Sequence, residues 1–276
     1  MSNLVLVIVI AAAVFFYFWA IMPRFDRARR QECLTFAGWD FAHRGLWDPE
    51  MGIPENSLAA FENAIRQKVA IELDVRLTKD DRVVVIHDSG LKRLCGVAGT
   101  VEGKTADELM SLTLSGTTWT IPLLAQVLRT VRGRVPLLIE VKRASNDRRG
   151  TAICKYLYKE LEFYSGDYMI QSFDPYVLRW FREKAPHVLT GQLASSAAGM
   201  GNSHPVLAMA VYLLLVNCIS RPDFISYDLR AAECVSVRIA HTIYRTPVFI
   251  WTVRTMNEYR QSHAQFDGVI FERFLP

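Results

Sequence analysis

Nine short apolar runs, separated by stretches with helical character, leave few architectures open to this chain. The runs are "DFAHRG", "AIELDV", "VVVIHD", "PLLIEVK", "YMIQSF", "VLTGQL", "DFISYD", "VFIWTV" and "DGVIFE". Helices are predicted over Ser57–Gln67, Pro122–Arg132, Arg149–Phe163, Pro175–Ala185, Glu233–Tyr244 and Met256–Gln265. Continuous apolar strands that alternate with helices predict a parallel sheet covered by helices. Repeated over roughly 240 residues, this pattern predicts an α/β fold, a TIM (β/α)8 barrel.

Nine runs are one more than the strands of such a barrel, and the spacing identifies the extra one. Only a few residues, around Thr78–Asp81, separate "ELDV" from "VVVIHD". A parallel crossover needs a dozen or more residues, so the third run cannot follow the second as a barrel strand. We therefore predict a hairpin that returns His87 to the barrel mouth near Asp74, which leaves eight parallel strands.

The first residues of the chain predict a single transmembrane helix ahead of the barrel. Leu4–Met22 is an uninterrupted apolar stretch. At about 1.5 Å per residue it reaches roughly 28 Å, close to the thickness of the hydrocarbon core of a bilayer. Tyr17 and Trp19 lie near its end, where interfacial aromatic residues are common. A cleaved signal peptide is the main alternative, but the first three residues carry no side-chain charge and Phe15–Met22 is bulky.

The charges that flank this stretch predict its orientation. Four arginines, opposed by one acidic residue, follow it: Arg24, Arg27, Arg29 and Arg30, with Asp26. The positive-inside rule places this basic flank, and the rest of the chain with it, in the cytoplasm. We predict an anchor with its flank over residues 1–30 and a barrel domain over residues 36–276, in a single-pass protein of the cell membrane.

Composition excludes several other classes of protein. The formal net charge is +4, and no long basic tract is present, so nucleic-acid binding is not indicated. The cysteines are five in number, scattered, and without a CxxC pair. This pattern disfavours a disulfide framework or a zinc site and agrees with a reducing compartment. The oligomeric state is left open by the sequence.

A second apolar run, Val206–Ile219, carries no charge and ends at Arg221 and Pro222. It is short for a membrane span and lies between the fifth and sixth barrel strands, where an outer helix belongs. The alternative is a helix that lies against the membrane to which the anchor brings it. Both interpretations stay open at this point.

Polar residues gather at the ends of the predicted strands, where barrel enzymes hold their reacting groups. They are His43 and Arg44 on the first strand, Glu72 and Asp74 on the second, Glu140 and Lys142 on the third, Gln171 on the fourth and Trp251 on the seventh, with His87 on the hairpin. Glu72 and Asp74 alternate and so face the same way. Three inward carboxylates need compensation, which a hard divalent cation, Mg²⁺ or Ca²⁺, supplies through oxygen ligands. The alternative is a charge layer in which these carboxylates pair with Lys142, Arg44 or Arg76.

Two histidines, His43 and His87, are expected at this same mouth, where both can act as general acid or base near neutral pH. Arg44 and Lys142 are fixed cations beside the predicted metal, which favours a substrate that carries a phosphate. The remaining histidines lack such neighbours and are expected on the surface or on helices; they are His187, His204, His241 and His263.

The motifs "AHRG", "PENS", "ELDVRLTKDDRVVVIHD", "LLIEVK", "QSF", "WTV" and "DGVIFE", in this order from Phe41 to Glu272, resemble the glycerophosphodiester phosphodiesterases. The resemblance implies a TIM barrel that hydrolyses glycerophosphodiesters to glycerol 3-phosphate and an alcohol with a divalent cation. By motif, it implies His43 and His87 as the acid/base pair. It also implies metal ligands at Glu72, Asp74 and Glu140, and phosphate or substrate contacts from Arg44, Lys142, Glu55 and Trp251.

The chain departs from the family pattern in two places. The last strand ends in Phe271-Glu272-Arg273 where a Thr-Asp-like pair is usual, and Ser195–Pro222 is a long insertion. With the anchor, this insertion raises a second possibility, a lysophospholipase D-like reaction on a lysophospholipid or glycolipid in the bilayer. A non-enzymatic alternative is a phosphodiester-binding membrane scaffold. The role of Glu55 stays open between a metal or substrate contact and the positioning of Arg44.

Overall fold

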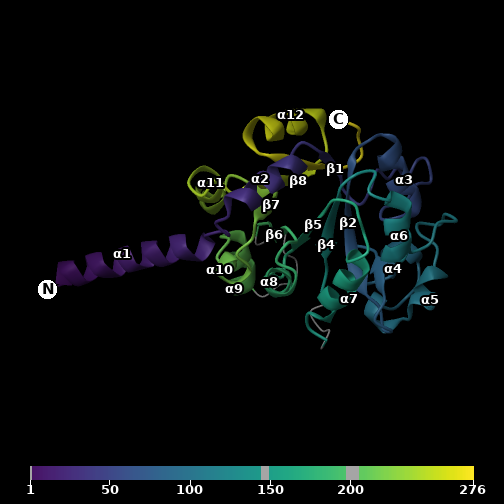
Figure 1. Ribbon diagram of the computed structural model, residues 1–276, viewed down its shortest axis with the longest axis horizontal. Coiled ribbons are helices and arrows are strands. Elements are labelled where there is room, and N and C mark those ends of the chain that lie inside the picture. The colour runs from purple at the N-terminus through teal and green to yellow at the C-terminus, as the bar shows by residue number, and fades with distance from the viewer. Residues whose placement is uncertain (1, 144–148, 197–204) are drawn as a thin grey trace.

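The predicted barrel is present. The computed structural model describes residues 2–143, 149–196 and 205–276. Eight parallel strands close into a barrel, because β1 pairs with β2 on one side and with β9 on the other. In barrel order they are β1 (Asp40–Ala42), β2 (Ala70–Leu77), β4 (Leu137–Val141), β5 (Tyr168–Ser172), β6 (Thr190–Ala194), β7 (Phe224–Asp228), β8 (Val248–Val253) and β9 (Gly268–Phe271). Figure 1 shows the helices arranged around these strands.

The predicted hairpin is also confirmed. Strand β3 (Val83–Val85) pairs antiparallel with β2, with Val75 opposite Val85 and Leu77 opposite Val83. The turn between them includes Asp81 in the left-handed region, at a φ of 60°. The chain then forms an insertion that the sequence analysis did not predict, with α4 (Lys92–Cys95), η1 (Val101–Gly103), α5 (Ala106–Met110) and a small core of its own.

The six predicted outer helices lie within a few residues of their expected bounds. They are α3 (Leu58–Arg66), α6 (Leu124–Val131), α7 (Ala152–Leu161), α8 (Pro175–Lys184), α11 (Val235–Thr242) and α12 (Met256–Gln265). Local caps explain several of the boundaries. The Ser57 hydroxyl accepts a hydrogen bond from the Ala60 amide at the start of α3, and Thr255 and Glu258 form a capping box at the start of α12.

The second apolar run forms two short helices, α9 (Pro205–Tyr212) and α10 (Asn217–Ser220), between β6 and β7. Ala208 and Val211 of α9 are buried against the barrel, which is the position expected of an outer helix. The opposite face of α9 is exposed although it is apolar, and it presents Val206, Leu207 and Met209.

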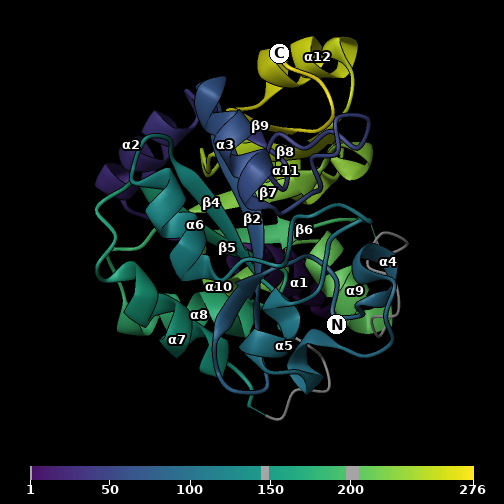
Figure 2. The same ribbon diagram turned by 90° about the vertical axis from the view of Figure 1, so that its right-hand side faces the viewer.

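A helix that the sequence analysis did not predict closes the amino-terminal end of the barrel. This helix, α2 (Arg27–Phe36), buries Cys33 and Phe36. They lie in a cluster with aromatic residues from the amino-terminal ends of the strands, among them Phe41 and Phe249. Figure 2 shows α2 at one end of the barrel and α4 at the other. Part of the basic flank therefore packs into the body of the protein. The division of the chain at residues 30 and 36 stays a prediction.

Helix α1 (Ser2–Ile21) projects from the side of the barrel, as Figure 1 shows. Only its last turns contact the body: the Tyr17 hydroxyl lies 2.7 Å from the Ser236 hydroxyl, and Asn217 donates to the Ile21 carbonyl at 3.0 Å. Within the described residues, the stretch Asn3–Ile21 is the one helix long and apolar enough to cross a bilayer, with a mean hydropathy of 2.8. A signal sequence passes the same test.

Candidate active site

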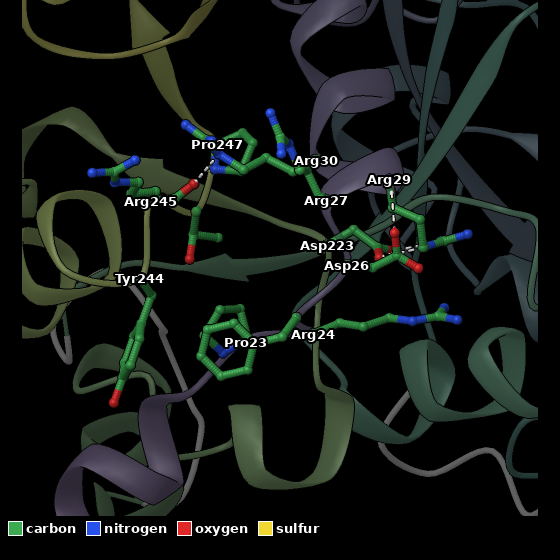
Figure 3. Close-up of a pocket in the computed structure, with 12 residues that line it drawn as sticks. Pro23, Arg24, Asp26, Arg27, Arg29, Arg30, Asp223, Tyr244, Arg245 and Pro247 are labelled. Carbon is green, nitrogen blue, oxygen red and sulfur yellow. Dashed lines mark hydrogen bonds and ion pairs between the residues drawn. The ribbon is translucent and has the colours of Figure 1, made fainter.

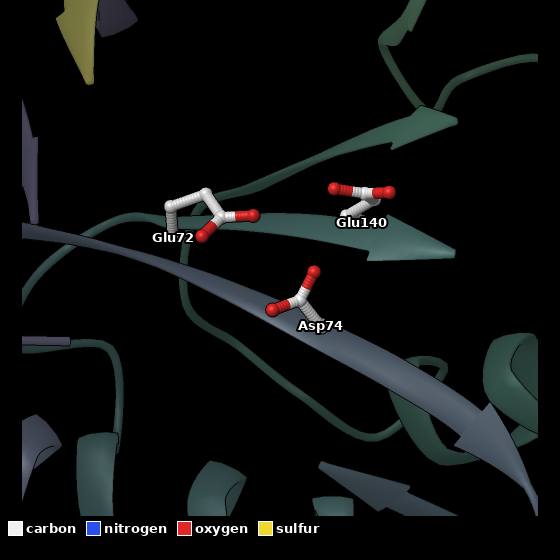
Figure 4. Close-up of side chains that lie close together, drawn as sticks. All are labelled: Glu72, Asp74 and Glu140. Carbon is white, nitrogen blue, oxygen red and sulfur yellow. The ribbon is translucent and has the colours of Figure 1, made fainter. Parts of the chain in front are cut away.

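Three carboxylates converge at the carboxyl-terminal mouth of the barrel. Glu72 and Asp74 come from β2 and Glu140 from β4, and the strand register places Asp74 directly beside Glu140. One oxygen from each residue lies within 4.8 Å of the others. Figure 4 shows the three side chains pointing toward a common space. The strand alternation that predicted this cluster therefore brings the three residues together.

The charges of this cluster are only partly balanced by protein cations. The Lys142 ammonium lies 2.5 Å from Glu140 Oε1 and 3.2 Å from Asp74 Oδ1. Burial alone would raise the pKa of Asp74, but Lys142, followed by His87 and Arg44, holds it well below its usual range. The pKa of Glu72 is raised well above its usual value, first by burial and then by the charges of Asp74 and Glu140. Glu72 is thus the carboxylate that the protein alone leaves uncompensated.

The donor set fits a hard divalent cation. All three ligand candidates offer oxygen, and the buried Asp74 Oδ1 contacts the Lys142 ammonium but accepts no well-aligned hydrogen bond. The predicted charge layer is present only in part, because Arg76 turns away from the carboxylates. Its guanidinium lies 3.0 Å from Glu102 and donates to the His87 carbonyl. A cation bound between Glu72, Asp74 and Glu140 would supply the missing positive charge.

His43 follows β1 and is held by a residue from the opposite end of the chain. Its Nδ1 lies 3.0 Å from Glu272 Oε2, just after β9. This contact leaves Nε2 of His43 for the cavity and selects the tautomer with a proton on Nδ1. Burial lowers the pKa of His43, and the hydrogen bond with Glu272 opposes that shift without reversing it. The imidazole is therefore neutral near pH 7 and able to accept a proton.

His87 follows the returning hairpin strand and has a carboxylate partner of its own. Its Nδ1 lies 2.6 Å from Oδ1 of the adjacent Asp88. The hydrogen bond with His87 is the largest cause that lowers the pKa of Asp88. Arg93, from α4 in the insertion, lies 2.5 Å from the second oxygen of Asp88. Both histidines at the mouth are thus oriented through Nδ1 by a carboxylate.

Arg44 and Glu55 form an ion pair beside the carboxylates. Arg44 Nη1 lies 2.8 Å from Glu55 Oε1, and Arg44 Nε lies 3.6 Å from Asp74 Oδ2. Glu55 also receives two hydrogen bonds from Arg93, at 2.8 and 3.0 Å. Both Glu55 oxygens are therefore engaged by arginine. Of the roles that the sequence left open for Glu55, these contacts favour the positioning of Arg44.

Both histidines line a cavity of about 230 Å³ at the mouth of the barrel. Arg44, Lys142 and Trp251 line it, as predicted. The Trp251 ring packs edge-on against Phe173 with 5.8 Å between ring centroids, and its indole nitrogen is buried without a partner. One wall of the cavity is therefore apolar, and the opposite wall carries the charged groups.

Several site residues were not predicted. Glu272 and Asp88 follow the same rule as the predicted residues, since each lies just beyond a strand end, and that signal was available. Asn56 donates to Asp74 Oδ2 at 2.9 Å and stands beside Glu55 in the "PENS" motif. Arg93 has no such signal, because it belongs to the insertion. Away from the mouth, His241 pairs with Asp267, His263 pairs with Asp40, and His187 packs near Tyr158, while His204 lies outside the described residues.

Known proteins share both the motifs and the fold. The model of the "Glycerophosphoryl diester phosphodiesterase family" matches residues 43–275. A glycerophosphodiester phosphodiesterase of Bacillus altitudinis is 34% identical over 157 residues, which cover 54% of this chain and 63% of that protein. Lysophospholipase D GDPD1 of Rattus norvegicus is 34% identical over 124 residues, covering 40% of this chain and 38% of that protein.

Among solved structures, the glycerophosphodiester phosphodiesterase of Thermotoga maritima superimposes with a TM-score of 0.64 at 26% identity, covering 84% of this chain and 92% of that one. The sequence match to the Bacillus protein spans somewhat less than two thirds of its length. The family match itself begins at His43 and continues past Glu272, so it includes every strand-end residue described above. The chain belongs to the glycerophosphoryl diester phosphodiesterase family.

Proposed function

We propose that this protein hydrolyses glycerophosphodiesters to glycerol 3-phosphate and an alcohol, at the surface of a membrane. The observation that carries the proposal is the meeting, at one barrel mouth, of two carboxylate-oriented histidines, three buried carboxylates and the cations Arg44 and Lys142. A phosphodiester is the substrate class that such a set of groups can both bind and cleave. The name of the Bacillus relative supports the glycerol-containing substrate.

His43 and His87 are assigned as the acid/base pair. One imidazole removes the proton of the glycerol hydroxyl next to the phosphate, and that oxygen attacks phosphorus in line with the leaving alcohol. The other imidazole protonates the departing oxygen. Water then opens the resulting cyclic phosphate to glycerol 3-phosphate, with the two histidines exchanging roles. Which imidazole acts first is not part of the proposal.

The charged wall binds and stabilises the reacting phosphate. Arg44 and Lys142 are assigned to its non-bridging oxygens, and Glu55 positions Arg44 through their ion pair. Trp251 and Phe173 provide the apolar wall against which the substrate packs. A divalent cation, Mg²⁺ or Ca²⁺, held by Glu72, Asp74 and Glu140, would neutralise the negative charge that develops on the phosphate.

A lysophospholipase D-like reaction is the second candidate, and two observations favour it. The rat relative carries that name, and α9, which exposes apolar side chains, lies near the base of α1 (Figure 1). The two reactions break the same kind of bond, between the phosphate and the head-group alcohol, and differ in whether the glycerol carries an acyl chain. From a choline-containing substrate, the first gives choline with glycerol 3-phosphate, whereas the second gives choline with lysophosphatidic acid.

The membrane part of the proposal rests on α1. We assign it as an uncleaved, single-pass anchor, with the barrel on the cytoplasmic side, because arginines follow it. The exposed portion of α1, Leu4–Phe16, is on the order of 20 Å long, which is shorter than the roughly 30 Å hydrocarbon core. The last turns of α1 must therefore also lie in the membrane.

This length difference places the elements around the base of α1 at the lipid interface. Helix α9, in which Val206, Leu207 and Met209 are exposed, lies on that side of the body in Figure 1. Both interpretations of the Val206–Ile219 run are then compatible. One face of α9 packs on the barrel, and the other contacts lipid.

The test uses the full chain in detergent, with glycerophosphocholine and lysophosphatidylcholine as separate substrates. We expect release of glycerol 3-phosphate from the first, loss of that release with EDTA, and loss in His43→Ala and in His87→Ala. Activity that survives chelation or either substitution contradicts the mechanism. Faster release of lysophosphatidic acid from the second substrate would favour the alternative, and binding without turnover would favour a scaffold.

A further inference from the structure

A second cavity, of about 310 Å³, lies at the base of α1, on the side of the barrel closed by α2. We propose that it binds a phosphate group, and we assign the head group of an anionic lipid as the source of that phosphate. Its walls come from the segment that joins α1 to α2 and from the loop that joins α11 to β8. Figure 3 shows the arginines of both segments around it. This inference rests on the proposed insertion of α1 in a membrane.

The cavity has an excess of positive charge that the described part of the chain does not neutralise. Four arginines in its wall form no ion pair with a described carboxylate: Arg24, Arg27, Arg30 and Arg245. The Arg30 guanidinium donates to the Arg245 carbonyl at 2.6 Å, which joins the two segments. The fifth arginine, Arg29, is already paired with Asp223 at 2.6 Å. Of the wall residues, only Asp26 then offsets the four cations.

One further feature suits an oxyanion rather than a solvated basic surface. Thr246 is only 3% exposed and lies in the cavity wall, and its hydroxyl has no hydrogen-bond partner. Such a buried, unpartnered hydroxyl is uncommon, and a phosphate oxygen is a suitable acceptor for it. The amino terminus of α2 also lies in the cavity wall, where the Asp26 carboxylate caps it by accepting hydrogen bonds from the Ala28 and Arg29 amides.

The position of the cavity matches the depth of lipid head groups. Arg24 follows closely on the end of α1 at Ile21, and the Tyr244 hydroxyl in the same wall donates to the Phe18 carbonyl of α1 at 2.9 Å. Phe25 packs on Tyr244 with 5.6 Å between ring centroids, and it is 65% exposed. An exposed aromatic rim beside an arginine cluster is the arrangement expected where acyl chains give way to phosphates.

An ordinary stop-transfer flank also supplies arginines after a span, and the difference between the two interpretations is structural. A flank needs charge alone and is indifferent to which arginines carry it. A binding site depends on Arg27, Arg245 and Thr246 in particular. Arg245 and Thr246 are far from the anchor in sequence, so they are not part of a flank. Substitutions at these positions therefore separate the two.

The experiment measures lipid retained by the full chain after reconstitution in phosphatidylcholine nanodiscs with and without phosphatidylglycerol. Native mass spectrometry after extraction counts the bound lipids. For Arg27→Gln with Arg245→Gln we expect retention of phosphatidylglycerol to fall about tenfold or more, since each arginine near a membrane surface contributes substantially to anionic lipid binding. The matched control, Arg66→Gln with Arg260→Gln, removes the same charge elsewhere and should retain lipid as the unsubstituted chain does.

Thr246→Val serves as the second variant, because it removes only a hydroxyl that has no partner and so should preserve the fold. We expect a several-fold loss of phosphatidylglycerol retention with an unchanged melting temperature. Equal retention in the cavity and control variants overturns the proposal in favour of a simple basic flank. Inorganic phosphate is titrated by calorimetry as a separate arm; tight binding of phosphate without lipid retention overturns the assignment to lipid.

Hydrolysis of glycerophosphocholine is followed in the same samples, since none of the substituted residues lies in the active-site cavity. Loss of lipid retention with activity unchanged is the expected result for the cavity variants. An inactive chain that still retains phosphatidylglycerol would contradict the proposed activity and leave this inference standing. A chain that does not insert into the nanodisc contradicts both the anchor and the lipid site.

Discussion

Glu272 Oε2 lies 3.0 Å from Nδ1 of His43, at the place where the last strand departs from the usual family pattern. The departure therefore supplies a partner to one of the two histidines. Arg254, which also lines the cavity, lies 3.1 Å from the same carboxylate oxygen. The Glu272 carboxylate thus contacts the His43 imidazole, and that imidazole lines the cavity. This is the arrangement expected of a residue that positions a catalytic base.

Glu272→Gln should reduce kcat about 10- to 100-fold, because the amide holds the imidazole less firmly and does not balance its positive charge. The hydrogen bond with Glu272 raises the pKa of His43 against the effect of burial, so its loss should lower that pKa further. Whichever role His43 has, the limb of the pH–rate profile that reports it should move to lower pH. Glu50→Gln, at an exposed position, is the control. A reduced rate with an unmoved profile would reject the pairing.

Glu72→Gln should change stability in opposite directions with and without metal. The pKa of Glu72 is raised by burial and by its acidic neighbours, so its ionised form destabilises the metal-free fold above the unfolded pKa of about 4. Removal of that charge should raise the melting temperature in EDTA.

With Mg²⁺ or Ca²⁺ present, Glu72→Gln should lower the melting temperature instead of raising it. A divalent cation at a hundredfold excess over its Kd adds about 2.7 kcal/mol to the stability of the unsubstituted protein, and the variant should lose most of that gain. Thermal unfolding of both proteins in EDTA and in each of the two metals provides the six values needed. A variant that gains as much from metal as the parent would place the cation elsewhere.

The sequence predicted the barrel and most of the site because both depend on local patterns. Alternation along β2 set Glu72 and Asp74 on one face, and the short gap before β3 required a hairpin. What it missed depends on contacts between distant segments. Arg93 reaches the mouth only because the insertion folds back over it. Helix α2 was missed because it lies in a basic stretch whose few apolar residues, Cys33 and Phe36, pack into the barrel end only in the folded protein.

The Glu55 ion pairs predict a second pH effect, on stability. Burial would raise the pKa of Glu55, but Arg93 and Arg44 lower it below its usual value. A lowered pKa means that the stabilisation is complete above the unfolded pKa and is lost as the pH falls through the folded one.

Glu55→Gln should therefore cost about 2 to 3 kcal/mol at pH 7, and the cost should shrink below roughly pH 4. Urea unfolding of the full chain in detergent at several pH values measures it. Glu50→Gln again serves as a control, which should show no such dependence. A cost that is the same at both ends of the pH range would show that packing, not charge, is responsible.

The packing of α2 predicts where the chain tolerates truncation. Arg29 contacts both oxygens of Asp223 at 2.6 Å and donates to the carbonyls of Pro186 and Val188 at 2.7 Å. Deletion of residues 1–30 removes this arginine and leaves the buried Asp223 without its cation, with hydrogen bonds from Thr190 only, which should cost about 3 to 5 kcal/mol. Deletion of residues 1–22 retains Arg29 and its helix cap, Asp26, and should give the more stable protein.

Differential scanning calorimetry of the two truncated chains tests this directly. Arg29→Gln in the longer of them should reproduce most of the loss, which separates the ion pair from the rest of α2. Arg27→Gln is the matched control, because Arg27 belongs to the same helix and forms no ion pair with a described residue. If the two truncated chains unfold at the same temperature, the first turn of α2 and its ion pair with Asp223 contribute no stability to the barrel.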